Sequence, residues 1–267
     1  MQTMLNNNAS CDIHHLGGGD ENPLQSMKRF RLARERALQK AVHPVEAQKN
    51  RWNPYSFEGG TVAAVAGADF IVMAADSRMS QFEVNILTRD AEKIHQLSDT
   101  VMLATCGFHG DILHMKRMLR SRMDKYEFDY QQQMSADLVS EMLARNLYYR
   151  RFFPFFTGAI LAGITEKGRG AVYSYDPVGM IEENPYSVSG TANAMIEPFF
   201  DAQLGWKTQD ASVMPMPALT VARACSVMKD AFRMATERDA QTGDKLHLVI
   251  VKKGAPAEHQ TVLLRED

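Results

Sequence analysis

The chain has 267 residues, of which 45% are hydrophobic and 23% charged, the proportions of an ordinary globular protein with one large domain or two small ones. Its formal net charge of −2 offers no positive field to nucleic acid or an anionic membrane, and no apolar run approaches the roughly 18 residues that span a bilayer. The three cysteines are odd in number and widely spaced, which disfavours a disulfide framework and favours a reducing compartment.

The N-terminal part of the chain, residues 1–59, differs in composition from the rest. Residues 5–22 are rich in Asn, Gly, His and acids and have no apolar period, so we expect them to be disordered. A basic stretch at 27–42 favours a helix. A mitochondrial presequence is one interpretation of that stretch, but the acidic residues ahead of it disfavour this. We predict that 1–59 is a pro-segment or extension, largely disordered and trimmed.

The remainder, 60–267, is predicted to be one domain without repeats or linkers. In chain order, apolar periodicity predicts strands at 61–66, 70–76, 83–88 and 100–106, helices over 112–126 and 138–147, strands at 157–165, 170–175 and 184–188, helices at 192–204 and 219–237, and strands at 246–252 and 259–264. This order places two sheets between two helical layers, which predicts an α+β fold with four layers in the order αββα.

A junction at Gly59-Gly60-Thr61 opens a strand of small apolar residues, and Ala-Ala-Asp76-Ser-Arg ends the next strand. This pattern resembles the mature start of a proteasome beta subunit, and the resemblance continues to about Leu264. It implies the αββα sandwich of the N-terminal-nucleophile hydrolases. In active members of that family, cleavage after glycine exposes a threonine whose hydroxyl attacks a peptide carbonyl, with the freed α-amine as the base.

Further positions match the family's motif one at a time. In this chemistry a buried lysine lowers the pKa of the attacking hydroxyl, a carboxylate pairs with the lysine, and backbone N–H groups at a glycine hold the oxyanion. The resemblance assigns these roles to Asp76 as the pairing aspartate, Lys93 as the lysine, Gly107 as the oxyanion glycine, Ser189 as the serine beside the nucleophile, and Asp239 and Thr242 as the distal aspartate and serine, with Thr in place of Ser. A buried ion-pair network that only supports the fold is the competing interpretation.

The spacing of the motif places glycine where the nucleophile belongs. In active members the aspartate follows the nucleophile by sixteen residues, and counting back from Asp76 reaches Gly60. Thr61 is one position late, and successive side chains of a strand point to opposite faces, so its hydroxyl is expected to turn away from Lys93. We therefore predict no catalytic residue in this chain and a vestigial site made of Gly60, Thr61, Asp76, Lys93, Gly107, Ser189, Asp239 and Thr242.

Segments such as 149–154 and 175–179 resemble a narrower group, the noncatalytic sixth beta class of the eukaryotic 20S particle. This resemblance implies a structural subunit needed for beta-ring assembly and for shaping the chamber in which ubiquitin-tagged proteins are degraded, in cytoplasm and nucleus. It implies neighbours of the fifth and seventh beta types, a beta subunit of the opposite ring and alpha-ring subunits. No cofactor, metal, nucleic acid or membrane is implied.

Two other functions compete with this one. The first is an active threonine endopeptidase with Thr61 as its N-terminal nucleophile. The second is a ring of identical subunits of the bacterial kind, which Gly60 disfavours because such a ring needs a threonine in every copy.

Three features have both a functional and a structural interpretation. The resemblance implies that the Asp176 loop helps to shape the substrate pocket of the neighbouring chymotrypsin-like subunit, whereas a turn aspartate that stabilises its own backbone is equally favoured. His109 and His114 lack a third metal ligand, so polar contacts at a helix start are expected. The aromatic run 152–156 is expected to pack against a helix or a neighbour rather than to stack nucleic-acid bases.

Overall fold

The computed structural model describes residues 28, 31–32, 55–81, 85–210 and 212–265. One compact unit extends from Tyr55 to Asp267 and contains all of the elements described below. The helix predicted over 27–42 and most of the expected extension at 1–59 lie outside the described residues. The boundary that the sequence places between 59 and 60 therefore stays a prediction.

Two antiparallel five-stranded sheets form the centre of this unit, and a short β3–β4 pair lies apart from them. The first sheet has the order β10-β1-β2-β11-β12, with β10 Tyr186–Gly190, β1 Thr61–Ala66, β2 Phe70–Asp76, β11 Lys245–Lys252 and β12 Glu258–Leu263. The second has the order β5-β6-β7-β8-β9, with β5 Ile94–Gln96, β6 Val101–Gly107, β7 Thr157–Ile164, β8 Gly170–Tyr175 and β9 Ile181–Asn184. The separate pair consists of β3 Met79–Gln81 and β4 Asn85–Thr88.

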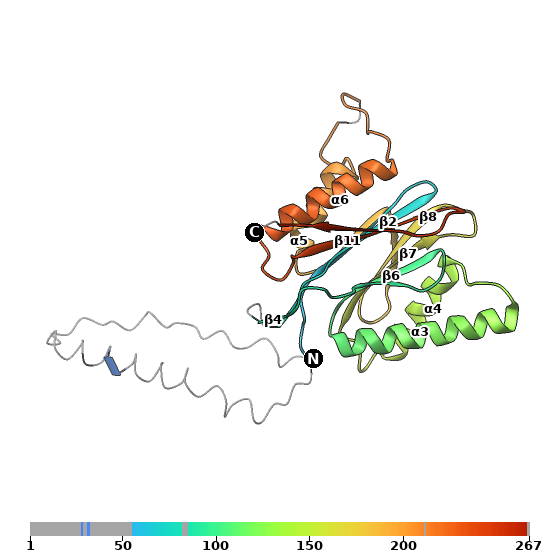
Figure 1. Cartoon of the computed structure of the whole chain (residues 1–267), viewed down its shortest axis with the longest axis horizontal. Coiled ribbons are helices and arrows are strands. Elements are labelled where there is room, and N and C mark those ends of the chain that lie inside the picture. Colours follow the sequence, from blue (N-terminus) through green and yellow to red (C-terminus); the bar gives the residue numbers. More distant parts are fainter. Residues whose placement is uncertain (1–27, 29–30, 33–54, 82–84, 211, 266–267) are drawn as a thin grey trace, which may run out of the picture. The chain divides into compact units, whose positions relative to one another are not determined.

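A pair of helices covers the outer face of each sheet (Figure 1). Helices α3 His109–Tyr130 and α4 Ala136–Tyr149 share an apolar core with the second sheet. Helices α5 Asn193–Gln203 and α6 Val221–Thr236 do the same with the first sheet. A third core lies between the sheets. The predicted αββα sandwich is confirmed.

Alternation along β1 divides its side chains between two cores. Ala63 and Val65 pack into the core under α5 and α6, while Val62 and Ala64 pack into the core between the sheets. Both faces of the strand are therefore buried, which explains why its sequence is continuously apolar. This alternation also determines which way the residues at its start point.

The predicted elements are confirmed, and the structure adds three short strands that the sequence pattern missed: β3, β5 and β9. These have three or four residues each, too few for an apolar period to stand out. The strand predicted at 184–188 is divided at Pro185, which separates β9 from β10. The strand predicted at 83–88 corresponds to β4, and residues 82–84 lie outside the described part.

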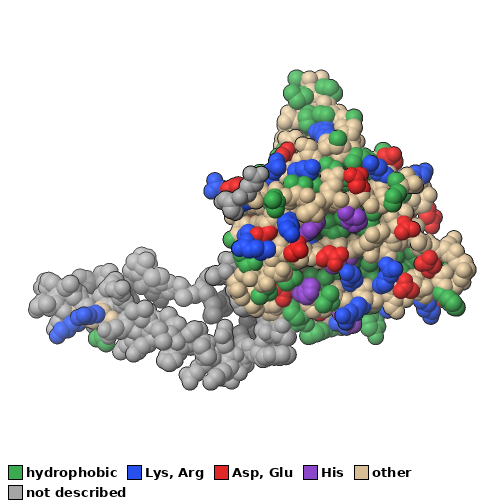
Figure 2. Space-filling view, viewed as in Figure 1, with side chains coloured by type: hydrophobic (Ala, Val, Ile, Leu, Met, Phe, Trp, Pro, Cys, Tyr) green, Lys and Arg blue, Asp and Glu red, His purple; other side chains and the backbone are tan. Residues whose placement is uncertain are grey.

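Basic and acidic side chains are interspersed over the face of the molecule shown in Figure 2, without a continuous stripe of one sign. Within the part of the chain that the structure describes, no helix is both long and apolar enough to cross a membrane.

His95 is a buried polar residue between the second sheet and α3. Its side chain is 3% exposed, and neither ring nitrogen has a hydrogen-bond partner among the described residues. It pairs across the strands with Leu103, which belongs to the core under α3 and α4. Burial, followed by the charges of Lys116 and His109, lowers the pKa of His95 from 6.5 to about 4.

This shift predicts a pH dependence of stability. Between about pH 6.5 and 4, unfolded His95 binds a proton that the folded chain excludes, so the free energy of unfolding rises with pH in that window. We expect His95→Leu to remove about 3 kcal/mol of the difference in unfolding free energy between about pH 4 and pH 7.5. Denaturant unfolding of the full chain measures it. His259→Leu, at an exposed histidine, is the control and should leave the difference unchanged; equal pH dependence in wild type and His95→Leu would contradict the assignment.

Candidate functional site

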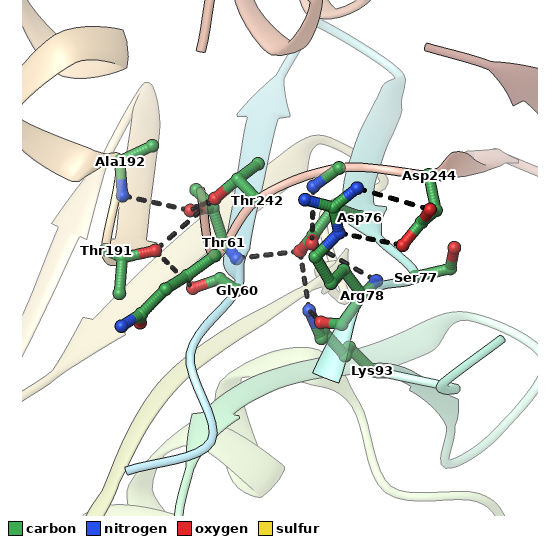
Figure 3. A network of polar contacts seen from close by, with 12 residues as sticks. Gly60, Thr61, Asp76, Ser77, Arg78, Lys93, Thr191, Ala192, Thr242 and Asp244 are labelled. Carbon is green, nitrogen blue, oxygen red and sulfur yellow. Dashed lines mark hydrogen bonds and ion pairs between the residues drawn. The ribbon is translucent and has the colours of Figure 1, made fainter. Parts of the chain in front are cut away.

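Asp76, the last residue of β2, is fully buried and accepts hydrogen bonds on both carboxylate oxygens. Its Oδ1 accepts from the backbone N–H of Thr61 at 2.8 Å and from Nζ of Lys93 at 2.6 Å. Its Oδ2 accepts from the backbone N–H groups of Gly243 at 3.1 Å and Arg78 at 3.3 Å. One carboxylate therefore joins the start of β1, the lysine and the loop that precedes β11 (Figure 3).

Lys93 forms a buried ion pair with this carboxylate. Its side chain is 6% exposed, and its ammonium also donates to the carbonyl oxygen of Arg78 at 2.5 Å. Burial raises the pKa of Asp76 above its ordinary value, and the charge and hydrogen bond of Lys93 oppose that shift. Either charge alone would be costly at this depth, so the two groups depend on each other.

Gly60 faces this ion pair and leaves room for it. A Cβ atom at position 60 would overlap Nζ of Lys93 and lie 3.0 Å from Oδ1 of Asp76. The backbone of Gly60 also has φ of +83°, which residues with a side chain rarely adopt. A side chain at this position would thus point at the lysine, as a nucleophile must, but here the ammonium occupies that space.

The hydroxyl of Thr61 lies on the other side of β1, where Ala63 and Val65 also point. Its Oγ1 accepts a hydrogen bond from the backbone N–H of Ala192 at 3.0 Å and lies 2.7 Å from Oγ1 of Thr242. Thr61 is fully buried. The hydroxyl therefore faces the start of α5 rather than Lys93 (Figure 3).

Asp239 and Thr242 belong to the network around Thr61. Thr242 donates to Oδ2 of Asp239 at 2.7 Å, so the Thr61 hydroxyl is left to donate to Thr242. Thr191 donates to the same carboxylate oxygen at 2.6 Å. Two groups of the predicted site residues therefore lie on opposite sides of β1. Lys93 and Asp76 form one group, and Thr242 and Asp239 form the other around the Thr61 hydroxyl. Thr191 and Ala192 were not predicted, because only the approach of β10 to β1 brings them here.

Ser189 and Gly107 lie close by on other strands. Ser189 pairs with Val62 across β10 and β1, and its Oγ lies 3.4 Å from Sγ of Cys106. Gly107 ends β6 with φ of +115°, and a Cβ there would lie 2.6 Å from the carbonyl oxygen of Phe156. Gly107 is therefore required by its own backbone whatever its relation to an oxyanion.

A second charged cluster, missed from the sequence, adjoins the first. Asp244 accepts from Nε of Arg78 at 2.8 Å and from Nη1 of Arg89 at 2.5 Å. Partial burial raises the pKa of Asp244, but the two guanidinium groups outweigh this and hold the pKa below its ordinary value. Arg78 also donates to the carbonyl oxygen of Ala240 at 2.9 Å. The cluster ties the end of β2 to the loop before β11.

The segment that precedes Gly60 is attached on both sides. Ser80 donates its backbone N–H to the carbonyl oxygen of Glu58 at 2.9 Å, and the backbone N–H of His109 donates to the Glu58 carboxylate. The ring of Tyr55 lies 5.4 Å from that of Phe108, centroid to centroid. The chain therefore passes from the start of α3 toward β3 immediately before it reaches Gly60.

Asp176 stabilises its own turn between β8 and β9. Its Oδ1 accepts from the backbone N–H groups of Val178 at 3.0 Å and Met180 at 2.6 Å. This is the structural role that the sequence allowed for, and it leaves the other carboxylate oxygen free of these bonds. Among the described residues, no cluster of three or more His, Cys, Asp or Glu side chains could hold a metal ion, and His109 and His114 form no such site.

Comparison with known proteins identifies the family of this chain. The proteasome subunit family matches residues 56–251. A Caenorhabditis elegans protein named proteasome subunit beta type-1 is 51% identical over 251 residues, 92% of this chain and 96% of the relative. Relatives of the same name from Danio rerio and Arabidopsis thaliana are each 40% identical, over 87% and 77% of this chain and 97% and 92% of their own lengths. The chain belongs to the proteasome subunit family, whose members build a threonine-type protease complex.

Proposed function

We propose that this chain is a noncatalytic, structural beta subunit of the 20S proteasome, of the sixth beta class, which mammalian nomenclature calls beta type-1. The observation that carries the proposal is the position of Gly60 against the Lys93–Asp76 pair. Support comes from the relatives named beta type-1 and from the αββα fold.

The chemistry of an N-terminal threonine needs a hydroxyl within reach of the lysine, and this chain does not provide one there. Gly60 has no hydroxyl, and the hydroxyl of Thr61 is engaged by Ala192 and Thr242 on the far side of β1. Moving Thr61 into the slot requires β1 to slip by one residue. That slip would turn every side chain of the strand to the opposite core and break its pairing with both β2 and β10.

The work left to such a subunit is assembly. A closed ring of unlike subunits needs a different complementary patch on each flank of every member. In the proposed particle the chain closes the beta ring between subunits of the fifth and seventh types, contacts alpha-ring subunits and one beta subunit of the opposite ring, and walls the chamber that degrades ubiquitin-tagged proteins. The site of action is the cytoplasm and nucleus. No cofactor enters this role.

Assembly without catalysis is tested on the intact particle. We expect tagged full-length chain to co-purify with alpha and beta proteasome subunits, identified by mass spectrometry. A covalent probe for N-terminal threonines should label other beta subunits of that particle, which are the internal positive control, and leave this chain unlabelled, because Gly60 offers no hydroxyl. Labelling of Thr61 would favour the active endopeptidase instead, and purification as a ring of this chain alone would favour the bacterial kind of assembly.

Processing of the N-terminus gives an independent prediction. Gly60 cannot attack the peptide bond before it, so trimming falls to active neighbours, and residues 55–59 are held by Ser80, His109 and Phe108. We expect the mature chain to begin within 30–55. Intact-mass measurement of the purified particle gives the start, with a catalytic subunit that begins at its threonine as the reference. A start at Thr61 would contradict the noncatalytic role.

We also propose that Asp176 influences the substrate pocket of the adjacent chymotrypsin-like subunit. Only one of its carboxylate oxygens is used by the turn, and the turn lies at the surface between β8 and β9. Two variants separate charge from turn geometry. Asp176→Asn keeps an oxygen that accepts from Val178 and Met180 and removes the charge, whereas Asp176→Ala removes both.

For both variants we expect assembled particles to cleave substrates with a basic side chain about fivefold more slowly, relative to other substrates of the chymotrypsin-like site. The reason is that the attraction between the Asp176 carboxylate and a basic side chain 4 Å away is about 1 kcal/mol in water, which corresponds to about fivefold in rate. Fluorogenic peptides that differ in one side chain measure the ratio, and the other proteasome activities are the controls. A change in Asp176→Ala alone would assign the effect to the geometry of the turn. Unchanged kinetics in both variants would contradict any influence of Asp176 on the neighbouring pocket.

A further inference from the structure

Helix α3 is held to its sheet by a narrower apolar surface than α6, its counterpart on the other sheet (Figure 1). Four of its 22 residues are buried, Ile112, Met115, Leu119 and Met123, and they form a single row at spacings of three and four. None of the last seven residues, 124–130, is buried. Helix α6 has 16 residues, of which eight are buried. Less hydrophobic burial therefore stabilises the attachment of α3.

The second sheet carries buried polar groups without partners on its helix-covered side. Among the described residues, six buried side-chain atoms have no hydrogen-bond partner, and four of these belong to His95, Thr105 and Thr157. The other two lie beside Gly59. Within the described part of the chain, none of the six belongs to a strand of the first sheet, to α5 or to α6. The two halves of the sandwich thus differ in how well their polar groups are satisfied.

These three residues, which we call the polar row, lie on one face of the sheet. His95 pairs with Leu103 across β5 and β6, and Leu103 belongs to the core under α3 and α4. Thr105 follows Leu103 by two positions on β6, so both side chains point to the same face. On β7, Thr157 precedes Ala159 of the same core by two positions, and Ala159 pairs with Thr105. The polar row therefore crosses three adjacent strands beneath the two helices.

His95 lies beneath the first half of α3, where the charges of Lys116 and His109 act on it. It supplies two of the four unpartnered atoms of the polar row. A buried polar group without a partner destabilises the closed state, because water would solvate the group if the helix moved away. The polar row therefore favours opening at the place where the apolar attachment is narrow.

The polar contacts that oppose opening are mostly near the surface. The backbone N–H of His109 donates to the carboxylate of Glu58, and Arg120, with a side chain 58% exposed, donates to the carbonyl oxygen of Leu97 at 3.0 Å. No side chain caps the N-terminus of α3, whereas Thr220 caps that of α6. Contacts exposed to water stabilise a helix only weakly, so they do not replace the missing apolar burial.

From these observations we infer that α3 is a cover that opens locally, so that water reaches His95 and the polar row while the rest of the domain stays folded. Elements with few buried apolar contacts are the ones that open without global unfolding. The opening is a property of the folded chain and does not rest on the proposed function. Two other arrangements are outcomes of the test: a polar row satisfied by bound water under a closed helix, and a helix that separates only when the whole domain unfolds.

Amide hydrogen exchange of the full-length chain, followed by mass spectrometry, tests the opening. We expect peptides from α3 to be protected at least about 100-fold less than peptides from α6. Their protection should also depend much less on urea, because a local opening exposes less surface than global unfolding does. Equal protection of the two helices with the same urea dependence would overturn the inference.

Two variants test the cause of the opening. His95→Leu removes the two unpartnered nitrogens and is expected to raise the protection of α3 at least about tenfold at pH 7, because the closed state no longer buries them. Unchanged or lower protection would show that bound water satisfies the ring, and would overturn the inference. Val227→Ala, at a buried residue of α6, is the control and should lower the protection of α6 at least about fivefold while leaving α3 unchanged. A matching loss in α3 would show that α3 opens only with the whole domain.

Discussion

The buried ion pair between Lys93 and Asp76 is the constraint on which the rest of the site depends. Neither charge is tolerable alone in a dry interior, and removing one partner of such a pair typically costs about 3–5 kcal/mol. Asp76 satisfies its remaining hydrogen-bonding capacity with the backbone N–H groups of Thr61 and Gly243. The pair thus fixes where β1 begins, and Gly60 fits beside it because it has no side chain. The lysine and the aspartate are therefore needed by the fold itself, whether or not they also take part in catalysis.

The position of β1 between two cores then determines the direction in which the Thr61 hydroxyl points. Val62 and Ala64 fill the core between the sheets, so Thr61 must point with Ala63 toward α5 and α6. There its hydroxyl satisfies the first N–H of the turn into α5 and donates to Thr242, whose own proton goes to Asp239. Polar residues that match catalytic positions thus stabilise the junction of β1, β10 and the loop before β11.

The turn between β8 and β9 is a second feature of interest, at the outer surface. The turn that Asp176 stabilises also carries Met180, and it packs on the end of α4 beside Tyr148. This turn therefore bears the carboxylate that we propose acts on a neighbouring subunit. In the noncatalytic role proposed above, the chain contributes to the protease through the groups that its surface presents to neighbouring subunits.

Apolar periodicity and motif spacing are local properties of a chain, so they were enough to predict the order of the main strands and helices and to place Gly60 sixteen residues before Asp76. The same counting predicted that the Thr61 side chain faces away from Lys93, since successive side chains of a strand point to opposite faces. Three features became visible only in the folded structure. These are the hydrogen-bond partners of the Thr61 hydroxyl, the charged cluster of Arg78, Arg89 and Asp244, and the short strands β3, β5 and β9. Those features depend on contacts between residues far apart in the chain, or on strands too short to show a period, and no local pattern records them.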